Sequence, residues 1–103
     1  MEDRTFSVLQ NKLILDEKYS VLDAAIMTAN ILTCYDEEIC KKIIDWANGK
    51  DVSAFELNGS TVAEVEEELA CSVFQALSFM NAITKDVDIY MDAMLRLEGD
   101  DVR

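Results

Sequence analysis

The stretch "TVAEVEEELACSVFQALSFMNA", residues 61–82, decides the fold because its pattern fits two different structures. Its pattern of apolar residues resembles the core of a helix-turn-helix, and it also fits one long helix. In both structures Thr61 and Glu64 have the spacing of a capping box, which starts a helix. The two structures differ in whether the chain turns at Ala70.

The helix-turn-helix interpretation meets two local difficulties and one electrostatic one. Glu66 falls where a small residue must pack between the helices, and Ala70 replaces the glycine of the turn. The segment that would read DNA contains no arginine or lysine, although phosphate neutralisation supplies most non-specific affinity for DNA. We therefore predict no direct binding to nucleic acid. The residues that this segment would offer to the groove are Val73, Phe74, Gln75, Leu77 and Ser78.

The single-helix interpretation rests on an apolar seam that alternates spacings of four and three residues from Leu69 onward. The pattern predicts a long C-terminal helix over residues 61–97, or two collinear helices that meet near Thr84–Asp86. The seam also predicts self-association into a homodimer, because a seam of this length exceeds what a small domain covers. The residues expected at the dimer contact are Met80, Val87 and Met94.

Two further helices are predicted from their caps, near residues 20–35 and 37–48. Ser20 and Asp36 are suitable N-caps, and Gly49 is placed to end the second of these helices. The first helix is expected to turn one apolar face toward the core. That face consists of Leu22, Ala25, Ile26, Ala29 and Leu32.

The N-terminal stretch favours a helix, although its apolar residues also alternate around Asn11–Lys12 as in a hairpin. Residues 50–60 form the main loop, in which residues 52–57 fit a short strand or an extended lid and Asn58–Gly59 a turn. The predicted fold is therefore all-α. It is a small helical bundle in which residues 1–103 form a single domain, with minor β content near the N-terminus or residues 52–57.

The net charge of −12 is uneven along the chain. Residues 1–50 hold nine acids and six bases, whereas residues 51–103 hold twelve acids and three bases. Such a surface repels nucleic acid and anionic membranes and attracts basic proteins. The start of the sequence lacks a signal peptide, and the most apolar run, residues 24–35, is too short to cross a bilayer. We therefore expect a cytoplasmic protein.

The sequence offers little for catalysis. It has no histidine, so a zinc ion bound by the three cysteines would lack a fourth soft ligand, and a cysteine nucleophile would lack its usual histidine base. The three cysteines are instead expected to be small buried hydrophobic residues. Glu64, Glu67 and Glu68 share a helix face and could hold a hard cation only loosely, because no loop of oxygen ligands lies nearby. We predict no enzymatic activity, no cofactor and no metal site, and rank a carboxylate-based, metal-dependent hydrolase last.

The leading hypothesis is a small acidic adaptor or inhibitor that binds a protein with a basic surface. Its composition is typical of inhibitors that phages and mobile elements encode against nucleic-acid enzymes such as host-defence nucleases, anti-CRISPR proteins among them. The alternative is a degenerate helix-turn-helix regulator that works as a dimer. Acidic residues would steer the basic partner, and two apolar loop residues would anchor it. The residues expected to bind the partner are Glu64, Glu67, Glu68, Asp86, Asp88, Asp92, Phe55 and Leu57.

Overall fold

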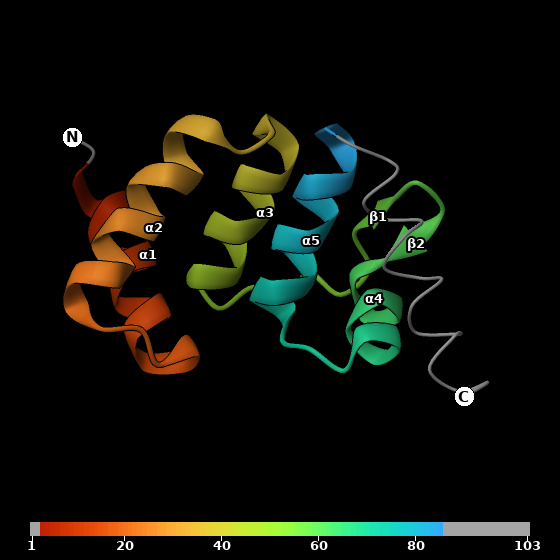
Figure 1. The fold of residues 1–103 in the computed structure, drawn as a ribbon, viewed down its shortest axis with the longest axis horizontal. Helices are drawn as coiled ribbons and strands as arrows, with labels where there is room; N and C mark the ends of the chain where they lie inside the picture. Colours follow the sequence, from red (N-terminus) through yellow and green to blue (C-terminus); the bar gives the residue numbers. More distant parts are fainter. Residues whose placement is uncertain (1–2, 86–103) are drawn as a thin grey trace, which may run out of the picture. The chain divides into compact units, whose positions relative to one another are not determined.

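Most of the chain folds into helices. The computed structural model describes residues 3–85, which contain five helices and one two-stranded hairpin (Figure 1). The predicted all-α class is therefore confirmed. The chain divides into two compact units, Met1–Val52 and Ser53–Arg103, each held together by its own internal contacts. The single-domain organisation of the whole chain stays a prediction.

The first unit contains three helices, α1 (Asp3–Glu17), α2 (Val21–Cys34) and α3 (Glu37–Ala47). Helix α1 contacts both of the others. Its Leu9 and Leu13 are fully buried. Residues four apart lie on the same face of a helix, so these two leucines give α1 one continuous buried ridge.

Lys12, next to that ridge, connects α1 to α3. Its ammonium nitrogen lies 5.3 Å from the centre of the Trp46 ring on α3 and 2.8 Å from the carboxylate of Asp16.

Because residues 3–17 are helical, the helical interpretation of the N-terminal stretch is confirmed, and the alternative hairpin around Asn11–Lys12 is wrong.

The caps predicted from the sequence are present. The Ser20 hydroxyl accepts the N–H of Asp23 at 3.1 Å, and the Asp36 carboxylate accepts the N–H of Glu38 at 3.2 Å. Gly49 follows α3 with a φ of +86° and donates its N–H to the carbonyl of Trp46 at 3.0 Å. Glycine adopts this left-handed backbone without steric strain, which explains why the helix ends there.

Helix α2 buries a different face from the predicted one. Leu22 and Ile26, which were expected in the core, are 68% and 60% exposed. The buried face consists of Ala24, Thr28 and Ile31. Both faces of this helix carry apolar residues, so periodicity alone cannot choose between them. Two of the three buried side chains, Ala24 and Thr28, are smaller than Leu22 and Ile26, and small side chains allow the backbones of packed helices to approach closely.

The second unit begins with a hairpin. Strand β1 (Glu56–Leu57) pairs antiparallel with β2 (Ser60–Thr61) across Asn58 and Gly59, whose φ values are +54° and +84°. Two consecutive positive φ values are the mark of a type I′ turn, which matches the twist of paired strands. The predicted turn and the short strand within residues 52–57 are therefore confirmed.

Helix α4 (Val62–Leu69) follows β2 directly, and helix α5 (Val73–Lys85) packs against α4. The predicted capping box is present: the Thr61 hydroxyl accepts the N–H of Glu64 at 3.2 Å, and the Glu64 carboxylate accepts the N–H of Thr61 at 2.9 Å. The buried apolar side chains on the two helices are Val62, Val65, Phe74, Ala76, Leu77, Met80 and Ile83.

The prediction of one helix from residue 61 to 97 is wrong, because the chain turns between α4 and α5. Ala70 has a left-handed backbone with φ 54° and ψ 50°, and both its N–H and that of Cys71 donate to the carbonyl of Glu66. Ser72 then starts α5 with a second reciprocal cap. Its hydroxyl accepts the N–H of Gln75 at 3.1 Å, and the Gln75 side chain accepts the N–H of Ser72 at 3.0 Å.

Two features explain the turn, a local capping box and the packing of α5 on α4. A Ser-x-x-Gln capping box can begin a new helix even where an apolar seam keeps its phase. Turning the chain also allows α5 to fold back on α4, so that apolar residues of both helices are buried. The alternative break near Thr84–Asp86 falls at the limit of the described residues.

The turn predicts that Ala70→Gly stabilises the protein by about 0.5–1 kcal/mol, because glycine adopts the left-handed backbone without the strain of a Cβ atom. The same change within a continuous helix would destabilise it by about 1 kcal/mol. Urea denaturation of the wild type and the variant measures whether the free energy of unfolding rises or falls. Ala29→Gly in the middle of α2 is the control and should lose about 1 kcal/mol. A loss of stability for Ala70→Gly would contradict the turn.

Thr28 supports a second prediction about stability. Its side chain is fully buried and its hydroxyl oxygen has no hydrogen-bond partner. We expect Thr28→Val, which keeps the shape and removes the hydroxyl, to raise the free energy of unfolding by about 1 kcal/mol. The matched control is Thr33→Val on the same helix, where the exposed hydroxyl donates to the carbonyl of Ala29 at 2.8 Å, and little change is expected. A less stable Thr28→Val variant would show that the hydroxyl is satisfied.

Candidate acidic protein-binding surface

The three glutamates predicted to bind a partner lie together on the outside of α4. Glu64, Glu67 and Glu68 are all exposed, at the i, i+3 and i+4 spacing that places side chains on one helix face. With Gly59 and Ser60 of the hairpin they line an open hollow of about 460 Å³. We call Glu64, Glu67 and Glu68 the acidic face.

The three carboxylates of the acidic face differ in their interactions with the rest of the chain. Glu64 is committed to the capping box with Thr61, so part of its role is structural. No ion pair joins Glu67 or Glu68 to any residue within 3–85, and the sequence contains no basic residue between Lys50 and Lys85. These two carboxylates therefore face solvent without a nearby cation from their own stretch of chain.

The predicted apolar anchors lie in the same unit as the acidic face. Leu57 pairs with Ser60 in the hairpin, and Ser60 lines the hollow beside the glutamates. The carbonyl of Phe55 accepts the N–H of Val62 at 2.9 Å, which ties the loop to the first residue of α4. Both Phe55 and Leu57 are half-buried, so each has area for the fold and area for a partner.

The other predicted site residues are not brought to this surface. Met80 is fully buried in α5. The remaining predicted residues lie outside the residues that the structure describes, so their part in partner binding or self-association stays a prediction. They are Asp86, Asp88 and Asp92 for the partner, and Val87 and Met94 for the dimer.

Helices α4 and α5 are joined by a short turn, as the helices of a helix-turn-helix are, but the face of α5 that would read DNA is largely closed. Phe74 and Leu77 are buried, and Val73 and Ser78 are half-buried. Gln75 is exposed, but its side-chain oxygen accepts the N–H of Ser72. Little of the helix surface that would enter a major groove is open.

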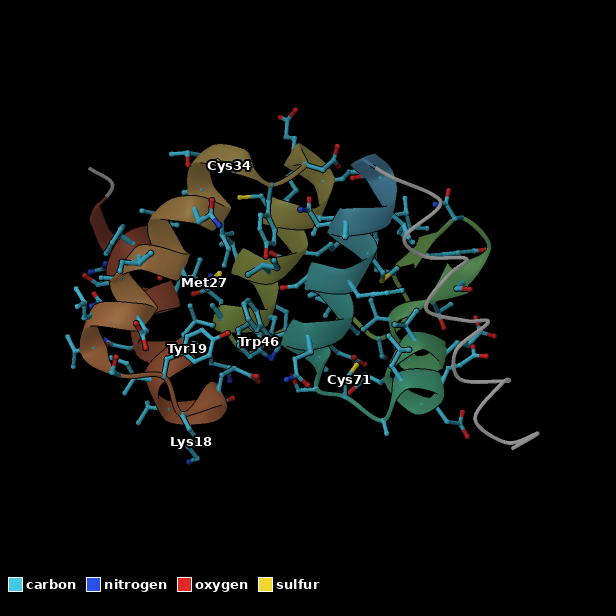
Figure 2. All side chains as sticks on the ribbon, viewed as in Figure 1. Lys18, Tyr19, Met27, Cys34, Trp46 and Cys71 are labelled. Atoms are coloured by element: carbon cyan, nitrogen blue, oxygen red, sulfur yellow. The ribbon has the colours of Figure 1, made fainter. Side chains whose placement is uncertain are left out.

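The three cysteines are not the buried hydrophobic residues that the sequence suggested. Cys34, the last residue of α2, is exposed, and Cys40 and Cys71 are half-buried. Cys71 lies in the connection between α4 and α5, as Figure 2 shows. Burial raises the pKa of the Cys40 thiol, which makes its reactive thiolate form less populated near neutral pH.

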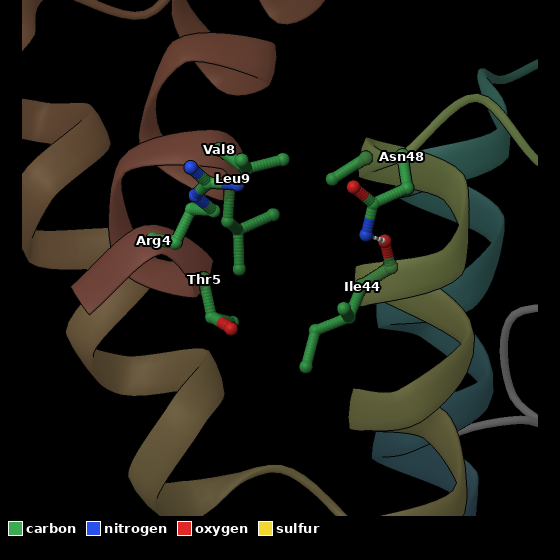
Figure 3. Close-up of a pocket in the computed structure, with 7 residues that line it drawn as sticks. Arg4, Thr5, Val8, Leu9, Ile44 and Asn48 are labelled. Atoms are coloured by element: carbon green, nitrogen blue, oxygen red, sulfur yellow. Dashed lines mark hydrogen bonds between the residues drawn. The ribbon is translucent and has the colours of Figure 1, made fainter. Parts of the chain in front are cut away.

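A small cavity of about 170 Å³ lies between α1 and α3 (Figure 3). Its walls are mostly apolar, and Arg4 and Asn48 supply polar groups. Asn48 is engaged locally, because its side-chain nitrogen donates to the carbonyl of Ile44 at 3.0 Å. The cavity is smaller than the usual small-molecule pocket of about 300–1,000 Å³. Its lining residues are Arg4, Thr5, Val8, Leu9, Ile44, Ala47 and Asn48.

A surface that sequence reasoning missed lies on α2. The exposed large apolar side chains of the described residues are Leu15, Val21, Leu22, Ile26 and Leu32, and all but the first belong to this helix. The sequence placed three of them in the core. The signal available was that α2 carries a single charged residue, Asp23, so charge does not show which of its apolar faces lies outside.

Within residues 3–85, no group of three or more histidine, cysteine or acidic side chains is arranged to hold a metal ion. None of the helices in this part of the chain combines the length and hydropathy needed to cross a membrane. Comparisons with protein-family models, curated proteins and solved structures found no match to this chain.

Proposed function

We propose that this chain is a small acidic adaptor or inhibitor that binds a protein with a basic surface and has no catalysis of its own. One observation supports the proposal: Glu67 and Glu68 are exposed on α4, and within residues 3–85 no ion pair joins either carboxylate to a basic side chain. Residues 53–85 hold five acids and one base, a net charge of −4. A concentrated negative surface raises the rate at which a basic partner is encountered.

The hairpin supports the same proposal. Its turn has a defined geometry, because Asn58 and Gly59 both adopt the left-handed backbone and the N–H of Val62 donates to the carbonyl of Phe55. A loop of defined geometry loses little entropy on binding. Phe55 and Leu57 are each half-buried, and Leu57 pairs with Ser60, which lines the acidic hollow. The arrangement is an apolar anchor next to a charged rim, the usual anatomy of a protein interface.

A second candidate function is a helix-turn-helix regulator that does not read DNA directly. The observation that favours it is the turn at Ala70, which separates two helices as that motif requires. The buried Phe74 and Leu77 weigh against DNA contact, and so does the lack of a cation between Lys50 and Lys85. We therefore place this candidate second.

The acidic face predicts that Glu67→Gln with Glu68→Gln slows association several-fold and flattens its dependence on salt, while dissociation stays nearly unchanged. The partner is first captured from the native cell on the wild-type chain and identified by mass spectrometry. Biolayer interferometry across a salt series then gives both rates. Glu64 is left intact so that the capping box is not lost.

The matched control is Glu37→Gln with Glu38→Gln, which removes the same charge from exposed positions at the start of α3. If the control slows association as much as the α4 variant, net charge and not the acidic face governs binding. Capture of a partner without a basic surface would also contradict the proposal.

Phe55→Ala tests whether the loop anchors the partner. We expect dissociation to become faster, by about tenfold for a hot-spot aromatic residue, because truncation removes buried area at the interface. Thermal melting of the same variant measures the contribution of Phe55 to the fold. A melting temperature several degrees lower with an unchanged dissociation rate would assign Phe55 to the fold alone. Its half-buried position makes both readouts necessary.

A further inference from the structure

Helix α2 presents a continuous apolar surface to solvent. Val21 and Leu22 are 66% and 68% exposed, Ile26 is 60% exposed and Leu32 is 36% exposed. The small side chain of Ala29 is also exposed between them. We call these five residues the α2 stripe. Leu22, Ile26, Ala29 and Leu32 follow one another at spacings of four, three and three residues, which keeps neighbours on one side of the helix, and Val21 lies at the edge of the stripe, one residue before Leu22.

The orientation of α2 is set by its opposite side. Ala24, Thr28 and Ile31 are fully buried, and α2 packs against α1 (Figure 1). The stripe cannot turn inward without exposing this buried face. It is therefore a fixed outer surface of the first unit, with an unfavourable free energy of hydration while it stays open.

We propose that the α2 stripe is the surface through which a second copy of this chain docks, with the two α2 helices antiparallel. The inference is independent of the acidic face and of the proposed function. It also differs in place from the C-terminal seam, whose Met80 is fully buried.

The area supports this occupant. The four large side chains expose roughly 400 Å² of apolar surface, within the range of about 300–600 Å² at which patches are often functional. A stable interface buries about 800 Å² on each partner, of which a little over half is apolar. The stripe thus supplies most of the apolar area that one side of a dimer requires.

Charge selects a second copy over a basic partner. The single charge on α2 is Asp23, which lies outside the stripe on a polar flank with Asn30, seven residues further on. A basic surface placed on the stripe would lose its hydration without gaining a counter-charge. A copy of the same uncharged stripe loses nothing of that kind.

Shape and dipole favour the antiparallel arrangement. Helix α2 has 14 residues and is about 21 Å long. When two such helices cross about their midpoints, Ile26 of one copy faces Ala29 of the other, so a large residue meets a small one. Leu22 of one copy then lies at the level of Thr33 of the other, next to its Leu32. Antiparallel helices also place opposite ends of their macrodipoles together.

Sedimentation equilibrium of the full-length chain tests the proposal. We expect a wild-type dimer that dissociates at least about tenfold more readily in Ile26→Asp, because a buried carboxylate at the centre of the stripe has no partner. Circular dichroism checks that the variant stays folded, as its exposed position predicts. Asn30→Asp adds the same charge on the polar flank of the same helix and should remain dimeric.

Salt distinguishes this interface from the proposed function. Raising the salt concentration should strengthen the dimer, because it screens the repulsion between two chains of net charge −12. The same change should weaken a basic partner on the acidic face. The two ideas can therefore fail separately.

A monomeric wild type would overturn the proposal, and a simultaneous fall in the melting temperature of Ile26→Asp would show that residues of the same chain cover the stripe. A dimer that survives Ile26→Asp but dissociates in Val87→Asp would also overturn it and assign the interface to the C-terminal seam.

Discussion

The left-handed backbone of Ala70 is the constraint on which the second half of the described chain depends. It directs two successive N–H groups, those of Ala70 and Cys71, to the one carbonyl of Glu66 and ends α4 after eight residues. Ser72 and Gln75 then start α5 in a new direction by capping each other. Without this turn, α5 could not pack back on α4, and the acidic residues would belong to a long isolated helix.

The same short stretch shows how structural and functional roles are divided among similar residues. Glu64 and Glu67 are both exposed acids on α4, but the carboxylate of Glu64 holds the N–H of Thr61 and so begins the helix. Glu67 has no such role in the described structure. An acidic cluster read from sequence therefore mixes residues that build the surface with residues that the surface offers to a partner.

The charge distribution gives the two exposed surfaces opposite physical character. The acidic face on α4 is highly charged and lies in a stretch of chain without cations, whereas the α2 stripe is apolar on a helix with one charged residue. Attraction at the first is long-range and screened by salt, and attraction at the second is short-range and proportional to buried area. The two proposed interactions therefore differ in kind, since one would depend on opposite charge and the other on uncharged apolar area.

Local chemistry in the sequence determined where most elements begin and end. Ser20, Asp36 and Thr61 cap helices, Gly49 ends one, and Asn58–Gly59 makes the hairpin turn, because each effect involves only neighbouring backbone groups. The positions of Glu64, Glu67 and Glu68 on one exposed face also followed from helical spacing alone.

Only the tertiary structure decided which apolar face of α2 is buried and whether the chain turns at Ala70. Leu22 and Ile26 look like core residues in the sequence, but α2 packs against α1 and it is Ala24, Thr28 and Ile31 that are buried. The seam through Ala70 keeps its helical phase, so its periodicity could not reveal the turn. The choice depends on the apolar area that α4 and α5 bury against each other, and this area exists only once the two helices are packed together.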